Sequence, residues 1–324
     1  MKDDGTAAKK IPHGELDQFA DLVRSHPEYL ATAYIREIYA SLGLQVLPDP
    51  FASDVSDLVI RALRTERPFS VIRLGDAEMN ILASDAYPNI PKLSDANFRA
   101  AMRNQEDFFE PDELWKLLLR EMLMSSIVQA DVVGVRGLWQ SPGKLLDLEK
   151  FIGRMKHSPR GPCGVWQSVD YLPGLARRGL FKDKVVASAH LYLGVLQSLD
   201  RIVPHARRVL LLTNHDGVVG KIRKKYPGLS IGHIPVGRTK GHEASPLDRP
   251  DFLRNVAGDL PTEMRGCFCL VGAGIWAEIY CTWIKQRGGV AVDIGSGFNL
   301  LNGAALRPVH RQLGLDRDNP FALE

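Results

Sequence analysis

Seven short runs of apolar residues, each separated from the next by a longer stretch, constrain the fold of this chain more than any other feature. Most of the runs are continuous rather than alternating, which predicts strands buried on both faces. Helical stretches lie between them, so we predict an α/β fold with a mainly parallel sheet and helices on both of its faces. The predicted strands are residues 69–74, 131–136, 185–190, 209–214, 229–236, 267–272 and 289–294.

Apolar residues at helical spacing dominate the N-terminal part of the chain. In residues 15–43 this spacing is broken near Pro27 and ends at Gly43, which predicts a helical segment ahead of the sheet. We therefore expect an N-terminal helical extension, residues 1–50, followed by the α/β domain, residues 51–324. Between the strands, helical spacing is clearest in two stretches, 111–130 and 277–289.

Composition excludes several classes of protein. The 324 residues are 45% apolar and 24% charged, as in ordinary globular proteins, and the net charge of +3 is too small to predict a nucleic-acid partner. The N-terminus lacks the apolar core of a signal peptide, so we expect a cytoplasmic protein. The most hydrophobic stretch, residues 267–284, is interrupted by small residues and by Glu278, which argues against a transmembrane segment. The four cysteines show no paired spacing and are expected to be reduced core residues.

The segment RLGDAE, residues 73–78, places an arginine and two acids at the end of the first predicted strand. Ligands of open α/β sheets bind at the carboxyl ends of the strands. In an extended segment Asp76 and Glu78 point to the same side, so both can reach one divalent cation. Arg73 can pair with a phosphate bidentately, and Gly75 marks where the chain leaves the sheet. The alternative is an ordinary turn with two incidental acids.

A second glycine-rich segment, GAGIWA, follows a late predicted strand. Gly272, Gly274 and Ala277 fit the GxGxxA pattern of dinucleotide-binding folds, and Asp293 is an acid at about the expected spacing. Against this interpretation, the pattern lies near the end of the chain instead of in the first strand–helix unit. The alternative is a turn that only lets strand and helix pack closely. The segment DIGSGFN, residues 293–299, lies too late to be a methyltransferase motif, and we interpret it as a ligand-facing turn.

Other polar residues follow the predicted strands and are expected along the same edge of the sheet. They are Arg136, His190 and Asn214, the last followed by His215 and Asp216. Asp216, His190 and His215 are candidates for a general base, and the sequence does not choose among them. The alternative for each is a capping or loop residue. The polar stretch 237–250 is either a lid over an anionic ligand or a surface loop.

Two segments together resemble the GT-D-type glycosyltransferases, bacterial sugar transferases with a Rossmann-like fold and a DxE motif. FSVIRLGDAE resembles that family's strand followed by RxGDGE, and CLVGAGIWAEIYCTWIKQRGGVAVDIGS resembles its late strand–helix–strand unit. The resemblance covers about residues 65–300. One departure is Ala77, which replaces the family's usual glycine between the two acids; if that position needs positive φ, the loop must differ here.

The resemblance implies a donor, a metal and an acceptor. The donor is a nucleotide sugar, commonly a uridine diphosphate (UDP) sugar; the metal is a divalent cation, Mn²⁺ or Mg²⁺; and the acceptor is a glycan or glycosylated protein. Asp76 and Glu78 match the acids that serve the metal and the diphosphate, Arg73 matches the preceding arginine, and Gly272 and Gly274 match the glycine turn near the nucleotide.

The first hypothesis for function is therefore a metal-dependent glycosyltransferase. The alternatives are an NAD(P)-dependent oxidoreductase built on GAGIWA and Asp293, and a non-catalytic nucleotide-binding protein with a site weakened by Ala77.

Overall fold

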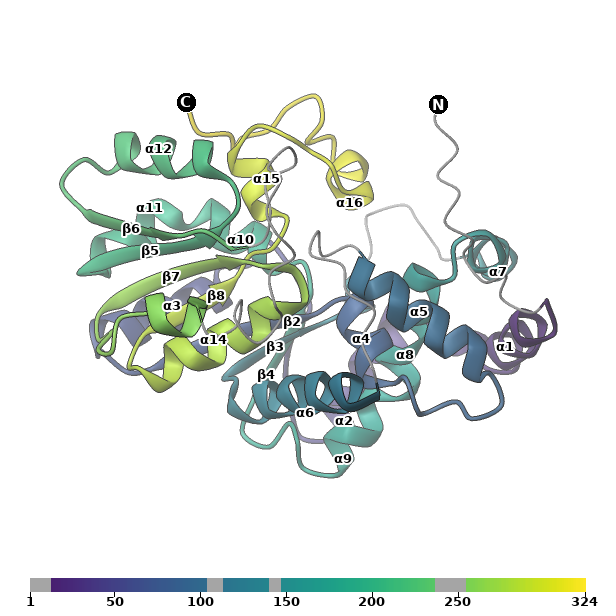
Figure 1. Ribbon diagram of the computed structural model, residues 1–324. Coiled ribbons are helices and arrows are strands. Elements are labelled where there is room, and N and C mark those ends of the chain that lie inside the picture. Colours follow the sequence, from purple (N-terminus) through teal and green to yellow (C-terminus); the bar gives the residue numbers. More distant parts are fainter. Residues whose placement is uncertain (1–12, 104–112, 140–146, 237–254) are drawn as a thin grey trace.

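The computed structural model describes residues 13–103, 113–139, 147–236 and 255–324, which contain one eight-stranded sheet (Figure 1). Its strand order is β1-β4-β3-β2-β8-β7-β5-β6, and every neighbouring pair is parallel. The predicted α/β, Rossmann-like fold is confirmed. The strands are β1 Gln45–Leu47, β2 Phe69–Leu74, β3 Val132–Val135, β4 Val185–Ser188, β5 Arg208–Thr213, β6 Ser230–Ile234, β7 Cys267–Gly272 and β8 Val290–Asp293.

All seven predicted strands are present, with ends shifted by at most two residues. Strand β1 was not predicted, because three residues without a buried side chain give no apolar run. This strand pairs with β4, Gln45 opposite Val185, so the sheet begins within the segment that we expected to be a helical extension.

Helices cover both faces of the sheet because both faces of the strands are apolar. In β2, Phe69 and Val71 belong to one buried cluster, and Ile72 and Leu74 belong to the cluster on the other face. The first face is covered by α3 Asp54–Arg64, α10 Tyr192–Gln197, α11 Leu199–Ile202, α12 Asp216–Lys225 and α15 Gly297–Leu301. The second is covered by α2 Thr32–Ser41, α4 Asp76–Leu82, α6 Glu113–Gln129, α9 Leu172–Arg177 and α14 Ala277–Gln286.

A smaller helical cluster lies beside the second face (Figure 1). Phe19 and Trp166 are at its centre, with ring centroids 6.2 Å apart. The predicted break near Pro27 is present, since the short helix η1, Pro27–Leu30, separates α1 from α2. The elements of this cluster are α1 His13–Ser25, α5 Pro91–Arg103, α7 Leu148–His157 and α8 Arg160–Asp170. The remaining helices are η2 Val203–His205, η3 Gly274–Trp276 and α16 Pro308–Gln312.

The topology fixes where a ligand can bind. From β2 the chain builds β3 and β4 outward on one side, and then crosses to build β5, β6 and β7 on the other. Strand β8 returns to the middle, between β7 and β2. The direction of winding therefore reverses between β2 and β8, and the carboxyl ends of strands at such a switch point form the ligand crevice of doubly wound folds.

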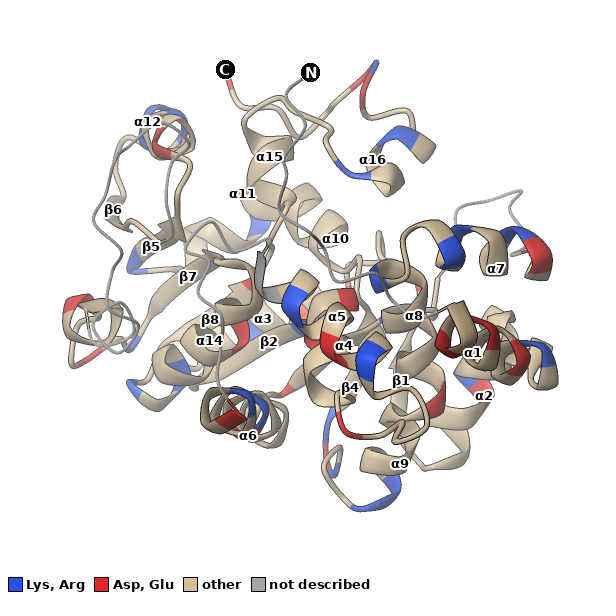
Figure 2. Cartoon of the chain, turned by 45° about the vertical axis from the view of Figure 1, so that its right-hand side comes forward, with Lys and Arg blue, Asp and Glu red and all other residues tan. Residues whose placement is uncertain are grey.

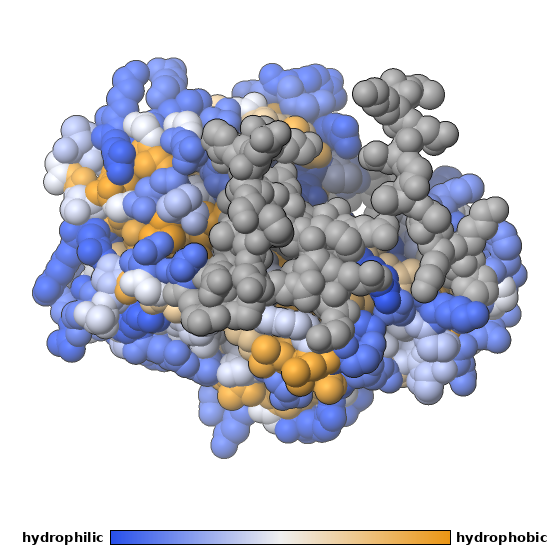
Figure 3. Space-filling view, viewed as in Figure 1, coloured by the Kyte–Doolittle hydropathy of each residue, from blue (hydrophilic) through white to orange (hydrophobic). Residues whose placement is uncertain are grey.

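Charged residues gather on the outer helices, whereas the sheet is mostly uncharged (Figure 2). An apolar surface lies on α6, where Leu114 and Leu117 are 73% and 54% exposed, and it is orange below the grey residues in Figure 3. Within the described ranges no helix has the length and hydropathy needed to cross a membrane. All four cysteines are free and buried, as expected.

Candidate functional site

The DxE acids lie in the first turn of a helix. Strand β2 ends at Leu74, Gly75 is the N-cap, and α4 begins at Asp76. Residues two positions apart in a helix, such as 76 and 78, are about 200° apart around its axis. The expectation that Asp76 and Glu78 share one side of an extended segment is therefore wrong, and the two carboxyl groups have different surroundings.

Asp76 lies on the accessible side of α4. Its side chain is 30% exposed, and its Oδ2 lies 3.4 Å from Nε of Arg160, the first residue of α8. The two helix starts are further joined by Asn80, whose Nδ2 donates to the backbone oxygens of Asp76 and Arg160. At Gly164 of α8 an added Cβ would lie 2.5 Å from the Asp76 backbone, so the helices touch through their main chains.

Glu78 turns into the protein. Its carboxylate folds back over Gly75, where an added Cβ would lie 2.6 Å from Oε2, so a side chain at this position would displace the carboxylate. Burial, followed by the charges of Asp76 and Asp293, raises the pKa of Glu78 to about 7, and Arg73 opposes this shift.

Ala77 is a normal helical residue. It is the second residue of α4, and among the described residues only Glu66 and Asp183 combine a side chain with positive φ. The alanine that replaces the family's glycine is therefore unstrained, and a helix favours it over glycine.

Arg73 is the centre of the site. Its Nε and Nη2 donate to the two carboxylate oxygens of Asp293 at 2.9 and 3.1 Å, and its Nη1 donates to the Ala189 carbonyl at 3.2 Å. The guanidinium also lies over the Tyr192 ring, 5.0 Å from its centroid. The bidentate face that we expected to hold a phosphate is thus occupied by Asp293. The dinucleotide hypothesis required the Asp293 carboxylate to bind a ribose. This carboxylate is 3% exposed and paired with Arg73, so it is not available for that role.

The backbone around Arg73 is shaped to admit its side chain. Gly295 has a φ of +42°, and a Cβ there would collide with Nη2 of Arg73. At Gly134 of β3 an added Cβ would lie 3.1 Å from Cγ of the same arginine. Glycines from two strand ends therefore make room for one guanidinium.

Glu278 is a buried acid that the sequence analysis did not assign to the site. It is in the first turn of α14 and 1% exposed, and its Oε2 has no hydrogen-bond partner among the described residues. Burial, together with the charges of Glu78 and Asp293, raises its pKa well above the ordinary value. The signal was a single charge in the apolar stretch 267–284. We call Arg73, Glu78, Glu278 and Asp293 the Arg73 cluster.

Arg136 and His190 meet beside this cluster, at the carboxyl ends of β3 and β4. Nη1 of Arg136 lies 3.2 Å from Nε2 of His190. Burial, followed by the charges of Arg136 and Arg73, lowers the His190 pKa well below its usual value, so the imidazole is neutral and its Nε2 accepts the bond. Trp139 borders His190, with ring centroids 5.7 Å apart.

The C-terminal helix α16 also reaches the site through residues that the sequence analysis missed. The Arg307 backbone N–H donates to Nδ1 of His310, which leaves Nε2 to donate to the Tyr192 hydroxyl at 2.8 Å. Burial, then Arg307 and Arg73, lowers the pKa of His310 to about 4. The ring under Arg73 is thus held by a neutral histidine.

Asn214, His215 and Asp216 lie at the carboxyl end of β5, away from the Arg73 cluster. Strands β8 and β7 separate β5 from β2, which places the two strand ends about 14 Å apart. The Asp216 side chain is 77% exposed, and its nearest ionic neighbour is Nδ1 of His233 at 3.8 Å.

The glycine turn after β7 has a packing role. At Gly272 an added Cβ would collide with the Phe298 ring of α15, so close packing explains this glycine. Gly274, at the start of η3, has a φ of +57°. The polar stretch 237–250, for which a lid and a surface loop were the two alternatives, lies outside the described residues.

The carboxyl groups of the Arg73 cluster partly fit a divalent cation. Within the part of the chain that the structure describes, no three His, Cys, Asp or Glu side chains converge as a metal-ligand set. Mg²⁺ is nevertheless commonly held by one or two carboxylates, with water and substrate phosphates completing its shell. The cluster has three acids for one guanidinium, and Glu278 leaves one buried oxygen unpartnered. Its chemistry therefore suits a cation held by two carboxylates.

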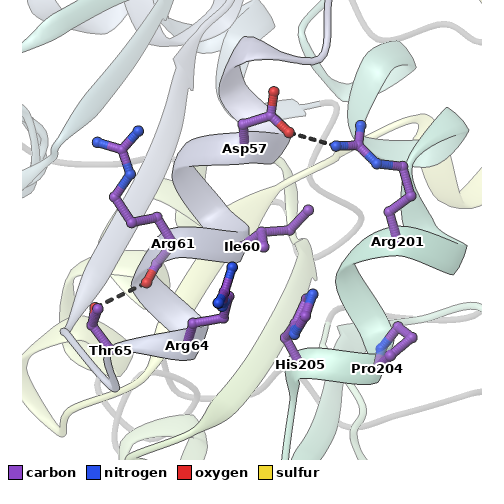
Figure 4. Close-up of a pocket in the computed structure, with 8 residues that line it drawn as sticks. All are labelled: Asp57, Ile60, Arg61, Arg64, Thr65, Arg201, Pro204 and His205. Carbon is purple, nitrogen blue, oxygen red and sulfur yellow. Dashed lines mark hydrogen bonds and ion pairs between the residues drawn. The ribbon is translucent and has the colours of Figure 1, made fainter.

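A pocket of about 760 Å³ lies elsewhere, between α3 and the α11–η2 segment (Figure 4). Arg201 is paired there with Asp57 at 2.7 Å. Arg61 and Arg64 occupy the last turn of α3, where cations are favoured by the helix dipole. These basic residues are thus explained by their positions, and the pocket contains none of the predicted site residues.

A comparison with protein-family models matches residues 52–149 to the GT-D fold-like domain. The matched stretch contains Arg73, Asp76 and Glu78, whereas Glu278 and Asp293 lie beyond it. The GT-D resemblance seen in the sequence is confirmed over this stretch, which includes the first of its two segments. A search of curated proteins and a search of solved structures each found no match.

Proposed function

Because the chain carries a GT-D fold-like domain, we propose that it is a metal-dependent glycosyltransferase that moves a sugar from a nucleotide sugar to a glycan or glycoconjugate acceptor. UDP-sugars are the proposed donor class. The observation that carries the proposal is the Arg73–Asp293 pair at the switch point between β2 and β8, with Glu78 in the first turn of the DxE helix that follows β2.

The proposed chemistry assigns roles to groups on this edge. Glycosyl transfer leaves negative charge on the departing diphosphate, and a bound Mn²⁺ or Mg²⁺ supplies positive charge to stabilise it. Glu78 is the DxE acid best placed to hold the cation, because its carboxylate is in the cluster. Arg136 and Arg160 are the guanidinium groups proposed to contact the diphosphate, since the fork of Arg73 is held by Asp293. Asp216 is kept as a proposed general base for an acceptor over β5.

The experiment is a turnover assay with a panel of UDP-sugars, in which release of UDP is measured with Mn²⁺ and with EDTA. We expect metal-dependent release for one or more donors and a loss of at least about 100-fold in Glu78→Gln, because the cation loses a carboxylate ligand. The matched control is Glu121→Gln, which makes the same change at an exposed position of α6. Undiminished turnover in EDTA, or in Glu78→Gln, contradicts the proposal.

A further inference from the structure

We propose that Glu278, not Asp76, is the second carboxylate that holds the divalent cation together with Glu78. The inference rests on the proposed function for the presence of a cation, and it changes which residues bind it. The DxE motif then contributes one metal ligand, and the late strand–helix unit contributes the other.

The Arg73 cluster contains more acidic than basic groups. The cluster has one guanidinium, and Asp293 accepts two hydrogen bonds from it. Glu78 and Glu278 remain as buried acids, at 8% and 1% exposure, and have no cationic partner of their own in the described ranges. A buried carboxylate is unfavourable unless it is paired, hydrogen-bonded or bound to a metal. A divalent cation between these two carboxylates, beside the Arg73–Asp293 pair, makes the cluster neutral.

One carboxylate oxygen of the Arg73 cluster belongs to Glu278 and is buried. Oε2 of Glu278 is buried and has no hydrogen-bond partner among the described residues. Such an atom in a folded protein calls for an explanation, and a missing ion is one of the recognised ones. Glu278 lies in the first turn of α14, which packs against β2 and β8, the strands that carry Arg73 and Asp293.

The backbone directs the three acids Asp76, Glu78 and Glu278 differently. Helix α14 packs against β2 and β8, so the acid in its first turn is carried to the switch point. The glycine at position 75 leaves the space into which the Glu78 carboxylate folds. Asp76 is on another side of α4, where it meets Arg160. Two carboxylates suffice for Mg²⁺, which keeps several water ligands and takes further oxygens from a diphosphate.

The test measures Mn²⁺ binding directly, by the loss of the electron paramagnetic resonance signal of free Mn²⁺, on the full chain with and without UDP. We expect Glu278→Gln and Glu78→Gln each to weaken Mn²⁺ binding at least tenfold. Asp76→Asn and the surface control Glu121→Gln are expected to stay within twofold of the wild type. Loss of binding in Asp76→Asn together with wild-type binding in Glu278→Gln overturns the inference.

Thermal melting gives a second measurement that does not depend on activity. In EDTA, Glu278→Gln is expected to melt above the wild type, because a neutral amide replaces a buried acid whose Oε2 has no hydrogen-bond partner among the described residues. With Mn²⁺ the wild type gains stability by mass action, and this gain is expected to disappear in Glu278→Gln. An equal Mn²⁺ shift in the variant and the wild type overturns the inference.

The two proposals fail in different ways. If the wild type binds Mn²⁺ through Glu78 and Glu278 but turns over no nucleotide sugar, the proposed function fails and the cation site stands. If it turns over a donor with Mn²⁺ and Glu278→Gln binds Mn²⁺ normally, the function stands and the cation site is wrong.

Discussion

Arg73 is held by a carboxylate, a carbonyl and an aromatic ring, and this arrangement requires a planar guanidinium. A lysine keeps the charge but cannot donate to both oxygens of Asp293 at once. We expect Arg73→Lys to lower the free energy of unfolding by about 2–4 kcal/mol, because the buried Asp293 loses part of its pairing. Urea unfolding measures this loss. Arg67→Lys, at an exposed arginine with a single contact to Asp131, is the control and is expected to cost less than about 0.5 kcal/mol.

The space around Arg73 gives a second prediction at the same scale. Gly295→Ala places a methyl group against the guanidinium at a residue of positive φ, so we expect a cost of more than about 2 kcal/mol. Gly303→Ala separates the two effects, because Gly303 also has positive φ, +90°, but has nothing within 4 Å. Its expected cost is the backbone strain alone, about 1 kcal/mol. Equal costs in urea unfolding would contradict the role of Gly295 in admitting Arg73.

The sequence predicted several of the residues that lie at the carboxyl edge of the sheet. It did not predict which residues each of them contacts. Arg73, Gly75 and Glu78 were found from the strand end. The ion pair between Arg73 and Asp293 was not predicted, because the two residues are 220 positions apart and no local pattern encodes such a contact. Glu278 was noticed only as a charge in an apolar stretch. Its meaning depends on the neighbours that the fold supplies.

Helices α4 and α8 set the direction of the DxE acids. Gly164→Ala forces an added methyl into the Asp76 backbone, and backbone cannot move aside as a flexible side chain can. We expect a loss of more than about 2 kcal/mol of stability and reduced nucleotide-sugar turnover, because the start of α4 is displaced. Gly161→Ala is the matched control in the same helix, with nothing within 4 Å of the new Cβ. It is expected to be neutral or to stabilise by up to about 1 kcal/mol. Urea unfolding and turnover are measured on both variants.

At the scale of elements, the sheet was predictable and α4 was not. Continuous apolar runs identified seven strands, because burial on both faces leaves a strong local signal. Strand β1 has three residues and no buried side chain, so its sequence contains no such signal. Helix α4 has seven residues, and its first turn was interpreted as an extended loop. An acid-rich helix start and an acid-rich turn have the same composition, and tertiary packing on α8 decides between them.

The pH dependence of the whole molecule's stability follows from the buried acids. The pKa of Glu78 is about 7 in the folded protein and near 4.5 when it is unfolded, so the folded state binds the proton more tightly. Its contribution to stability is complete below about pH 4.5 and is lost as the pH rises through 7. Without metal, Glu78→Gln is therefore expected to gain stability relative to the wild type over this range, by roughly 3 kcal/mol.

The measurement is urea unfolding of both proteins in EDTA at pH 4.5, 6 and 7.5. The difference between the two proteins isolates Glu78 from the other titrating groups. A difference that does not change with pH, or that changes in favour of the wild type, contradicts the assignment of Glu78 as a buried, weakly compensated acid.

The place of β8 in the sheet has a consequence for how the molecule assembles. This strand follows all the other described strands in the sequence, yet it lies between β2 and β7 and pairs with both. Until it is inserted, the sheet consists of two separate halves whose open edges face each other. Open strand edges promote aggregation, and contacts between residues far apart in the chain form slowly. A growing polypeptide on the ribosome therefore carries both unpaired edges until β8 has been synthesised, and the Arg73–Asp293 pair forms only when the two halves are joined.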